Sequence, residues 1–440
     1  PARLAIVADV SDLKKKLLSA ADALEKPGVA DFDWPSGVHF ARATRAGGIA
    51  FLFPGQGSQY VGMGSDVAIH FDAGRRVWDE APDVAGVVFP PPTFDEAERA
   101  EHERRLTATE NAQPAITAAS LALLRLLERV GLRPELVGGH SLGEVAALRA
   151  AGVFDDAGAL AVARARGAQM ADASRESSGA MTSVVAKRAD VERLLERWKL
   201  DVVVANDNAP AQVVLSGPTG ALAEAEKLLA AEKISFRRLA VATAFHSPLV
   251  SAACAPFRAA IEPLAVGAPT LVAFSNTTAA PFPSDAAALR DRLASAIAAP
   301  VRFVEQIEAM YTAGARTFVE VGPGSVLTKL VARCLEGRPH MAVALDERGR
   351  SGISALWSAL GRLSVAGIAL ELDGLWDGDA LPEDPTEKVP PKLAVKITGV
   401  THAKPYPPPS GELTLPPNLP RTRPRPSPAE PPPTPAPRPL

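Results

Sequence analysis

The chain has 440 residues, which is too long for one compact domain and suits two or three. Its 47 basic and 50 acidic side chains leave a formal net charge of −3, so no basic surplus exists to attract nucleic acid or an anionic membrane. Hydrophobic residues make up 47%, enough for a substantial core, and no apolar run is long enough to span a bilayer. Cys254 and Cys334 have no neighbours at CxxC or CxxxH spacing, which predicts neither a disulfide scaffold nor a metal site. We expect a soluble, cytoplasmic protein.

The first 46 residues predict a small αβ unit. The stretch ARLAIVA (2–8) and the stretch GVHFARA (37–43) have the composition of strands. Between them, SDLKKKLLSAADALEK (11–26) has apolar residues at helical spacing, with Ser11 in the N-cap position.

Residues 47–179 and 247–345 predict an α/β core with a parallel sheet. GIAFLFPGQGSQ (48–59) is an apolar strand that leads into a glycine-rich turn, and residues 115–131 form a periodic helix that ends at Gly131. The order strand, tight turn, helix recurs in ELVGGHSLGEVAALRAAG (135–152) and in TFVEVGPGSVLTKLV (317–331). Strands that alternate with helices are typical of parallel α/β sheets.

Residues 180–246 break that alternation. They contain, in order, a strand, a helix, two strands, a helix and a strand, in the segments AMTSVVA, ADVERLLERWK, DVVVAN, QVVLSG, TGALAEAEKLLAAEK and SFRRLAV. This βαββαβ order is the signature of a ferredoxin-like unit. We predict a smaller ferredoxin-like subdomain inserted into the α/β core.

The end of the chain is rich in proline, since 20 of the 41 prolines lie in residues 381–440. Proline lacks a backbone donor and favours polyproline II, so we predict that residues 385–440 are a proline-rich linker. The sequence starts at Pro1 without a methionine, and its proline-rich end leads to no further module. We therefore expect it to be a piece of a larger protein.

A serine nucleophile is predicted at Ser141, in Gly139-His140-Ser141-Leu142-Gly143. G-x-S-x-G between a strand and a helix is the nucleophile elbow of hydrolase-like folds. Glycines flank the serine because the backbone turns sharply there, and the helix N-terminus supplies free N–H groups for an oxyanion. The alternative is an ordinary glycine-rich turn.

A serine nucleophile needs a base, and His246 is the candidate among seven histidines. It follows the last strand of the predicted insertion and precedes a Ser-Pro turn, at a domain junction where clefts form. His140 adjoins Ser141, and we assign it a packing role. Five other histidines have polar or linker contexts and are expected on the surface: His39, His70, His102, His340 and His402.

Seven segments together resemble one family. They are FPGQGSQYVGMG (53–64), GHSLGE (139–144), RARGAQM (164–170), NAPAQVVLSG (208–217), AFHSPL (244–249), PVRF (300–303) and EVGPGSVLTKL (320–330). The chain resembles the malonyl-CoA:acyl-carrier-protein transacylase family, specifically an acyltransferase domain of a multidomain polyketide or polyunsaturated fatty acid synthase. Residues 1–46 resemble the linker that follows a ketosynthase domain, and residues 346–384 resemble the segment that follows such acyltransferase domains.

The resemblance implies a reaction. Ser141 would attack the thioester of malonyl-CoA with His246 as the base, and the malonyl group would pass to the pantetheine thiol of an acyl carrier protein domain. Backbone N–H groups of Gln56 and Leu142 would bind the oxyanion, although Gln56 also suits an ordinary turn. No cofactor is implied, since malonyl-CoA is the substrate and phosphopantetheine belongs to the carrier. The parent chain would also contain a ketosynthase domain.

The resemblance also implies the substrate contacts. Arg166 would pair bidentately with the malonyl carboxylate, which suits a planar, permanently charged guanidinium, whereas Arg164 would face another side of its helix. Phe245, in Ala-Phe-His-Ser, is the malonyl-type pattern and would crowd a methyl branch, although it also suits a core aromatic. Asn208 is a candidate substrate contact or simply a hairpin asparagine. Ala296 replaces the Asn or Gln whose backbone carbonyl orients the histidine in the family.

Two rival functions stay open at this stage. A proofreading acyl hydrolase of the same family would share Ser141 and His246, although such enzymes lack the carboxylate-binding arginine that Arg166 supplies. An inactive docking module would not need the intact Ser141, His246 and Gln56.

Overall fold

The computed structural model describes residues 2–43, 47–176, 178–239, 241 and 243–376. The predicted proline-rich linker at 385–440, the end of the predicted 346–384 segment, and His402 lie outside the described residues.

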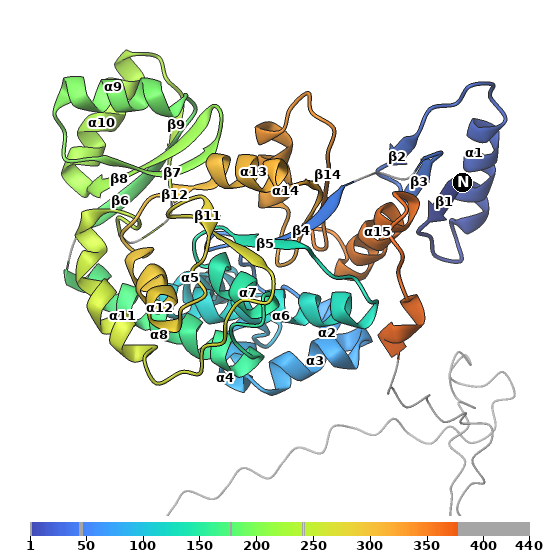
Figure 1. The fold of residues 1–440 in the computed structure, drawn as a ribbon, viewed down its shortest axis with the longest axis horizontal. Coiled ribbons are helices and arrows are strands. Elements are labelled where there is room, and N and C mark those ends of the chain that lie inside the picture. The colour runs from blue at the N-terminus through green and yellow to red at the C-terminus, as the bar shows by residue number, and fades with distance from the viewer. Residues whose placement is uncertain (1, 44–46, 177, 240, 242, 377–440) are drawn as a thin grey trace, which may run out of the picture. The chain divides into compact units, whose positions relative to one another are not determined.

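The larger sheet has six strands in the order β11-β10-β5-β4-β13-β14 (Figure 1). Its strands are β4 (Gly48–Phe53), β5 (Leu136–Gly139), β10 (Val272–Ser275), β11 (Ala280–Pro281), β13 (Ala315–Glu320) and β14 (Met341–Ala344). All neighbours are parallel except β10 and β11, which are antiparallel. The parallel α/β core predicted from the sequence is confirmed.

Helices cover both faces of this sheet, so its strands are apolar on both sides. In β4, Leu52 packs with residues of α13 and α14, whereas Phe51 and Phe53 pack into the core formed with α6, α7 and α8. Figure 1 shows α13 and α14 on one side of the sheet, and α6 and α7 on the other. The helices of this core are α2 (Ser65–His70), α3 (Asp72–Asp79), α4 (Pro82–Val88), α5 (Glu96–Thr107), α6 (Thr109–Arg129), α7 (Gly143–Ala150), α8 (Asp156–Glu176), the 3-10 helix η1 (Pro248–Ala253), α11 (Cys254–Ala260), α12 (Ala286–Ser295), α13 (Phe303–Thr312) and α14 (Val326–Cys334).

The smaller sheet confirms the ferredoxin-like subdomain. Its elements are β6 (Gly179–Val184), α9 (Arg188–Trp198), β7 (Val203–Ala209), β8 (Gln212–Pro218), α10 (Thr219–Ala231) and β9 (Phe236–Arg238). The four strands are antiparallel in the order β9-β6-β8-β7, as the βαββαβ topology requires. A fifth strand, β12 (Val301–Arg302), was not predicted; it joins the edge parallel to β7 and so ties this sheet to the core.

The N-terminal unit has three strands in the order β1-β3-β2 and one helix. Its elements are β1 (Arg3–Ile6), α1 (Leu13–Leu24), β2 (Phe32–Trp34) and β3 (Val38–Ala41), and it contacts α15 (Gly352–Val365), which the 3-10 helix η2 (Leu372–Trp376) follows.

Two predictions about this unit are wrong. Ser11 does not cap α1, because its N–H and hydroxyl both donate to Asp9 in a preceding turn, and Asp12 occupies the N-cap position. His39 is not a surface residue. It is buried, with Nδ1 2.6 Å from Asp33 and Nε2 3.1 Å from the Ser358 hydroxyl of α15, a long-range contact that local sequence does not reveal.

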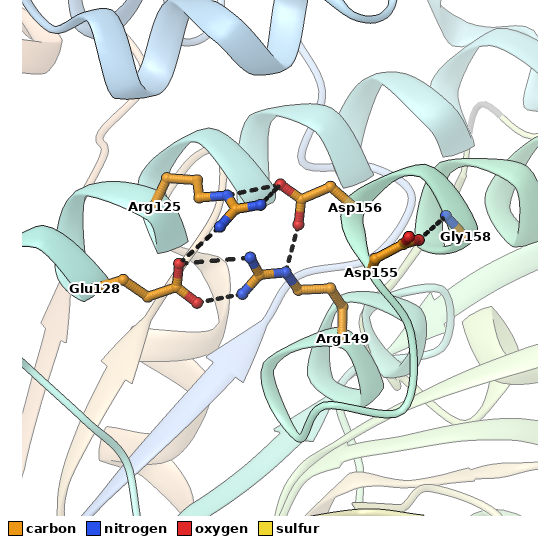
Figure 2. Close-up of polar contacts among 6 residues, drawn as sticks. All are labelled: Arg125, Glu128, Arg149, Asp155, Asp156 and Gly158. Atoms are coloured by element: carbon orange, nitrogen blue, oxygen red, sulfur yellow. Dashed lines mark hydrogen bonds and ion pairs between the residues drawn. The ribbon is translucent and has the colours of Figure 1, made fainter. Parts of the chain in front are cut away.

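A half-buried ion cluster joins the ends of α6, α7 and α8 (Figure 2). Arg125 of α6 contacts Asp156, the first residue of α8, through Nε and Nη2 at 2.7 and 2.6 Å. Arg149, in the last turn of α7, donates to both Glu128 and Asp156. Two cations and two anions therefore balance one another where three helices meet.

Among the described residues, no helix is both long and apolar enough to cross a membrane.

Candidate active site

Ser141 lies in the turn between β5 and α7, as the sequence predicts. Its φ of 54° is in the left-handed region, which is uncommon for a residue with a side chain and is typical of a nucleophile elbow. The flanking glycines are needed because a Cβ at Gly139 would collide with the backbone of Gly143. A Cβ at Gly143 would collide with the carbonyl oxygen of Phe53. The sharp turn therefore depends on close backbone contacts between β4, β5 and α7.

His246 lies against the serine, with Nε2 2.7 Å from the Ser141 hydroxyl oxygen. Its Nδ1 is 2.9 Å from the carbonyl oxygen of Ala299 and 3.2 Å from that of Ala296. Carbonyl oxygens only accept hydrogen bonds, so Nδ1 carries the proton and Nε2 is free to accept one. The backbone of Ala296 thus contacts the histidine although its side chain differs from the family pattern.

The surroundings of His246 favour its neutral form. The ring is buried, and burial together with the nearby charge of Arg166 lowers its pKa to about 3. A neutral imidazole with a free Nε2 is the form that a general base requires.

Arg166 points from α8 into the same site. Its guanidinium donates to Gln113 Oε1 at 2.9 Å and to the Ser141 hydroxyl at 3.2 Å. Burial lowers its pKa to about 10, while the charge of Glu144 opposes this shift, so Arg166 stays charged at neutral pH. Arg164 is exposed and pairs with Asp83, as its predicted surface position requires.

Of the two residues predicted to bind an oxyanion through their backbone, Leu142 directly follows the serine and Gln56 lines the same cavity. Leu142 is buried at the start of α7, and Gln56 lies in the loop after β4, where its side chain accepts from the Thr109 hydroxyl at 3.0 Å. Within the part of the chain that the structure describes, neither backbone N–H has a hydrogen-bond acceptor. Both donors are therefore available to a bound group.

A cavity of about 510 Å³ contains Ser141, His246 and Arg166. Part of its lining is apolar, from Met170, Met181, Val214, Leu239, Val241 and Phe245, while Arg237 and Arg348 add basic groups. Asn208 and His140 also line it, and Asn208 Oδ1 is 2.7 Å from His140 Nε2. In this structure Asn208, on β7, therefore partners His140. The described residues contain no cluster of three His, Cys, Asp or Glu side chains that could hold a metal ion.

Sequence reasoning missed the residues behind the elbow. Asn276 accepts a hydrogen bond from the Ser141 backbone N–H at 2.5 Å, and Gln306 and Glu144 contact Asn276. One feature of the sequence could have pointed to Asn276. It directly follows the apolar strand β10, much as His140 and Ser141 follow β5. Only the pairing of β10 with β5, far apart in sequence, brings the two together.

Residues 50–369 match the acyl transferase domain family. The chain belongs to this family. It is 35% identical to the malonyl CoA-acyl carrier protein transacylase of Bacillus subtilis, over 70% of this chain and 97% of that protein. It is 33% identical to part of a polyunsaturated fatty acid synthase from Thraustochytrium, over 75% of this chain but 12% of the synthase polypeptide. The family resemblance predicted from the motifs is confirmed, and the chain is an acyltransferase of the malonyl-CoA:acyl-carrier-protein transacylase type.

Solved structures of the same family share this fold. The acyltransferase domain from the second module of the salinomycin polyketide synthase has a TM-score of 0.73 and 30% identity, over 87% of this chain and 88% of that one. A malonyl transacylase solved in complex with its type II polyketide synthase acyl carrier protein has a TM-score of 0.63 and 32% identity. That match covers 70% of this chain and 99% of that one.

Proposed function

We propose that this domain transfers a malonyl group from malonyl-CoA to the pantetheine thiol of an acyl carrier protein, through an ester on Ser141. One observation carries the proposal. The hydroxyl oxygen of Ser141 lies 2.7 Å from Nε2 of His246 and 3.2 Å from a charged guanidinium of Arg166, inside one cavity. A nucleophile, a base and a carboxylate-binding group are thereby within reach of one small acyl group.

The first half-reaction forms the acyl-enzyme. The Ser141 oxygen attacks the thioester carbonyl carbon while His246 Nε2 takes the hydroxyl proton. The carbonyl oxygen becomes an oxyanion, which the backbone N–H groups of Gln56 and Leu142 stabilise. The C–S bond then breaks, His246 returns the proton to the sulfur, and CoA leaves a malonyl ester on Ser141.

Arg166 selects the acyl group by its charge. In the free enzyme the guanidinium contacts the Ser141 hydroxyl and lowers the pKa of His246. A malonyl carboxylate paired with Arg166 compensates that charge, so protonation of His246 during attack becomes easier. An acetyl group leaves the charge uncompensated. Phe245, at the cavity wall, leaves less room for a methyl-branched extender.

The second half-reaction needs a carrier protein. Its pantetheine thiol gives a proton to His246 and attacks the ester, and Ser141 is regenerated when His246 returns the proton to the serine oxygen. The relatives support this partner, since one is named a malonyl CoA-acyl carrier protein transacylase and another was solved with its acyl carrier protein. Relatives that are multidomain synthases support a neighbouring ketosynthase domain in the parent chain.

Intact-mass analysis after incubation with malonyl-CoA tests the proposal against its rivals. A stable malonyl adduct on Ser141 that transfers to a phosphopantetheinylated carrier protein supports the transferase. Rapid release of free malonate without transfer indicates an acyl hydrolase. No adduct and no CoA release indicate a docking module. The matched control is Ser141→Ala, which must give no adduct.

A further inference from the structure

We infer that Asn276 is a positioning residue that fixes the placement of Ser141 and His246 relative to each other. The inference rests on the proposed function in one respect, that Ser141 is the nucleophile. Asn276 directly follows β10, is 2% exposed, and lines no part of the cavity. It cannot touch the substrate, so any effect on the reaction passes through other residues.

The side chain of Asn276 holds both ends of the elbow turn. Its Oδ1 accepts from the backbone N–H of Ser141 at 2.5 Å, and its Nδ2 donates to the carbonyl oxygen of Gly139 at 2.7 Å. The second Nδ2 proton goes to Oε1 of Gln306, whose own Nε2 donates to Gly139 at 3.3 Å. A backbone N–H only donates and a carbonyl only accepts, so these partners fix which way the amide points.

The elbow needs such an external tie. Ser141 has a φ of 54°, and a non-glycine residue in this strained region persists only where the surrounding structure holds it there. One rigid amide that spans Gly139 and Ser141 sets the width of the turn and the direction of the hydroxyl. It also occupies the N–H of Ser141, which leaves the N–H of Leu142 as the elbow's donor to the oxyanion.

The backbone of Asn276 is also hydrogen-bonded to the segment that holds His246. Its carbonyl oxygen accepts from the N–H of Arg302 at 3.1 Å. Arg302 lies three residues after Ala299, whose carbonyl holds Nδ1 of His246. The N–H of Asn276 donates at 2.5 Å to the buried carboxylate of Glu144, in the first turn of the elbow helix α7. All four polar groups of this residue therefore end on segments that position the nucleophile or the base.

The experiment measures how fast Ser141 reacts, with and without malonyl-CoA. We would compare wild type, Asn276→Ala and Asn276→Asp in two assays, single-turnover CoA release and the rate of Ser141 labelling by a fluorophosphonate. Asn276→Asp keeps an acceptor for the Ser141 N–H but loses both donors. We expect Asn276→Ala to slow both reactions by about 100-fold, the scale of a 1 Å misplacement, with Asn276→Asp in between and the KM for malonyl-CoA little changed.

Two further variants separate positioning from stability. Thr270→Val removes a hydrogen bond of 2.9 Å to the carbonyl of Ala151, at the far end of the same helix α7, and serves as the control. It should lower the melting temperature without slowing acylation. Gln306→Leu removes the hydrogen bonds of Gln306 to Asn276 and Gly139 and should also slow both reactions. This variant tests the inference if the Asn276 variants fold poorly.

Three results would overturn the inference. If wild type is labelled and the folded Asn276 and Gln306 variants react at the wild-type rate, the inference alone fails. The inference alone also fails if Thr270→Val slows acylation as much as an Asn276 variant that loses the same amount of stability. If wild-type Ser141 is never acylated, the proposed function fails and the inference fails with it.

Discussion

The carbonyl oxygen of Ala299 lies 2.9 Å from Nδ1 of His246, where a catalytic triad has a carboxylate. A neutral acceptor fixes the tautomer of the imidazole but adds no negative charge to stabilise an imidazolium. Burial and the charge of Arg166 therefore determine the pKa of His246, which falls from 6.5 to about 3. Among the described residues, no Asp or Glu side chain contacts His246, so the hydrogen bonds that orient its ring come from backbone carbonyl groups.

The pH dependence of acylation follows from this arrangement. The reactive form is the neutral imidazole, and it persists as the pH falls through 6.5 because the free-enzyme pKa lies near 3. We expect kcat/KM for malonyl-CoA, which reports the free enzyme, to stay flat from pH 7.5 to 5.5. The measurement is the initial rate of CoA release across this range. An acid limb centred at pH 6.5 would show that the histidine is not held in this environment.

The proposed roles of Ser141 and His246 predict two losses of different size. Ser141→Ala should abolish acyl-enzyme formation without unfolding the protein, since it removes one hydroxyl that faces a cavity. His246→Ala should slow acylation by about 10²–10⁴-fold, the usual contribution of a general base. Intact mass and single-turnover CoA release measure both effects. A residual adduct in Ser141→Ala would refute the nucleophile, and a loss of only a few-fold in His246→Ala would assign the base to another group.

The ion cluster of Figure 2 predicts a loss of stability rather than of chemistry. Arg149→Met leaves the buried carboxylate of Asp156 and that of Glu128 with Arg125 as their one remaining partner in the cluster. Because Arg125 still pairs with both carboxylates and Glu128 is part-exposed, we expect a loss of about 1.5–3 kcal/mol of unfolding free energy, the usual size for hydrogen bonds to a charged group. Acylation per folded molecule should stay near wild type, because the change lies roughly 10 Å along α7 from the elbow.

Urea unfolding measures this cost, and an exposed pair provides the control. Arg104 pairs with Glu101 on the surface of α5, and Arg104→Met should change the unfolding free energy by less than about 0.5 kcal/mol. Equal effects of Arg149→Met and Arg104→Met would mean that the cluster contributes no more than a surface ion pair.

The parts of the fold that local patterns encode were predictable. Glycines at 139 and 143 around Ser141 predicted the elbow, because only a tight turn needs both. The βαββαβ order predicted the small sheet, because hydrophobic periodicity is read within each element. The start of α6 was missed, since Pro114 indicates a helix boundary, whereas the helix begins at Thr109 and contains that proline in its second turn.

The contacts that complete the site were not predictable from one sequence. Asn276 reaches Ser141 only because β10 pairs with β5, and His246 meets the carbonyl of Ala299 only where the two sheets join. These pairings depend on tertiary packing between segments more than 50 residues apart. The short strand β12 was missed for the same reason, because its two residues form a strand only beside β7.

The last prediction concerns Arg166 and decides whether the enzyme is built for a diacid. Arg166→Ala leaves the malonyl carboxylate without its partner in a buried site. Losing a charged hydrogen-bond partner costs about 1.5–3 kcal/mol, so kcat/KM for malonyl-CoA should fall at least tenfold. Acetyl-CoA has no carboxylate, and the pKa of His246 rises when the neighbouring charge is removed. Its transfer should therefore be unchanged or faster, and the ratio of the two kcat/KM values is the measurement.

Two companion variants make the ratio specific to Arg166. Arg166→Lys should rescue malonyl transfer only in part, because an ammonium cannot reproduce the planar fork that reaches Gln113 and Ser141 together. Arg164→Ala removes an exposed guanidinium on the same helix, two residues earlier, and should leave the ratio unchanged. If Arg166→Ala instead weakens both thioesters equally, the guanidinium supports the site's structure and does not read the carboxylate. The selection of malonyl would then have to come from the cavity wall around Phe245.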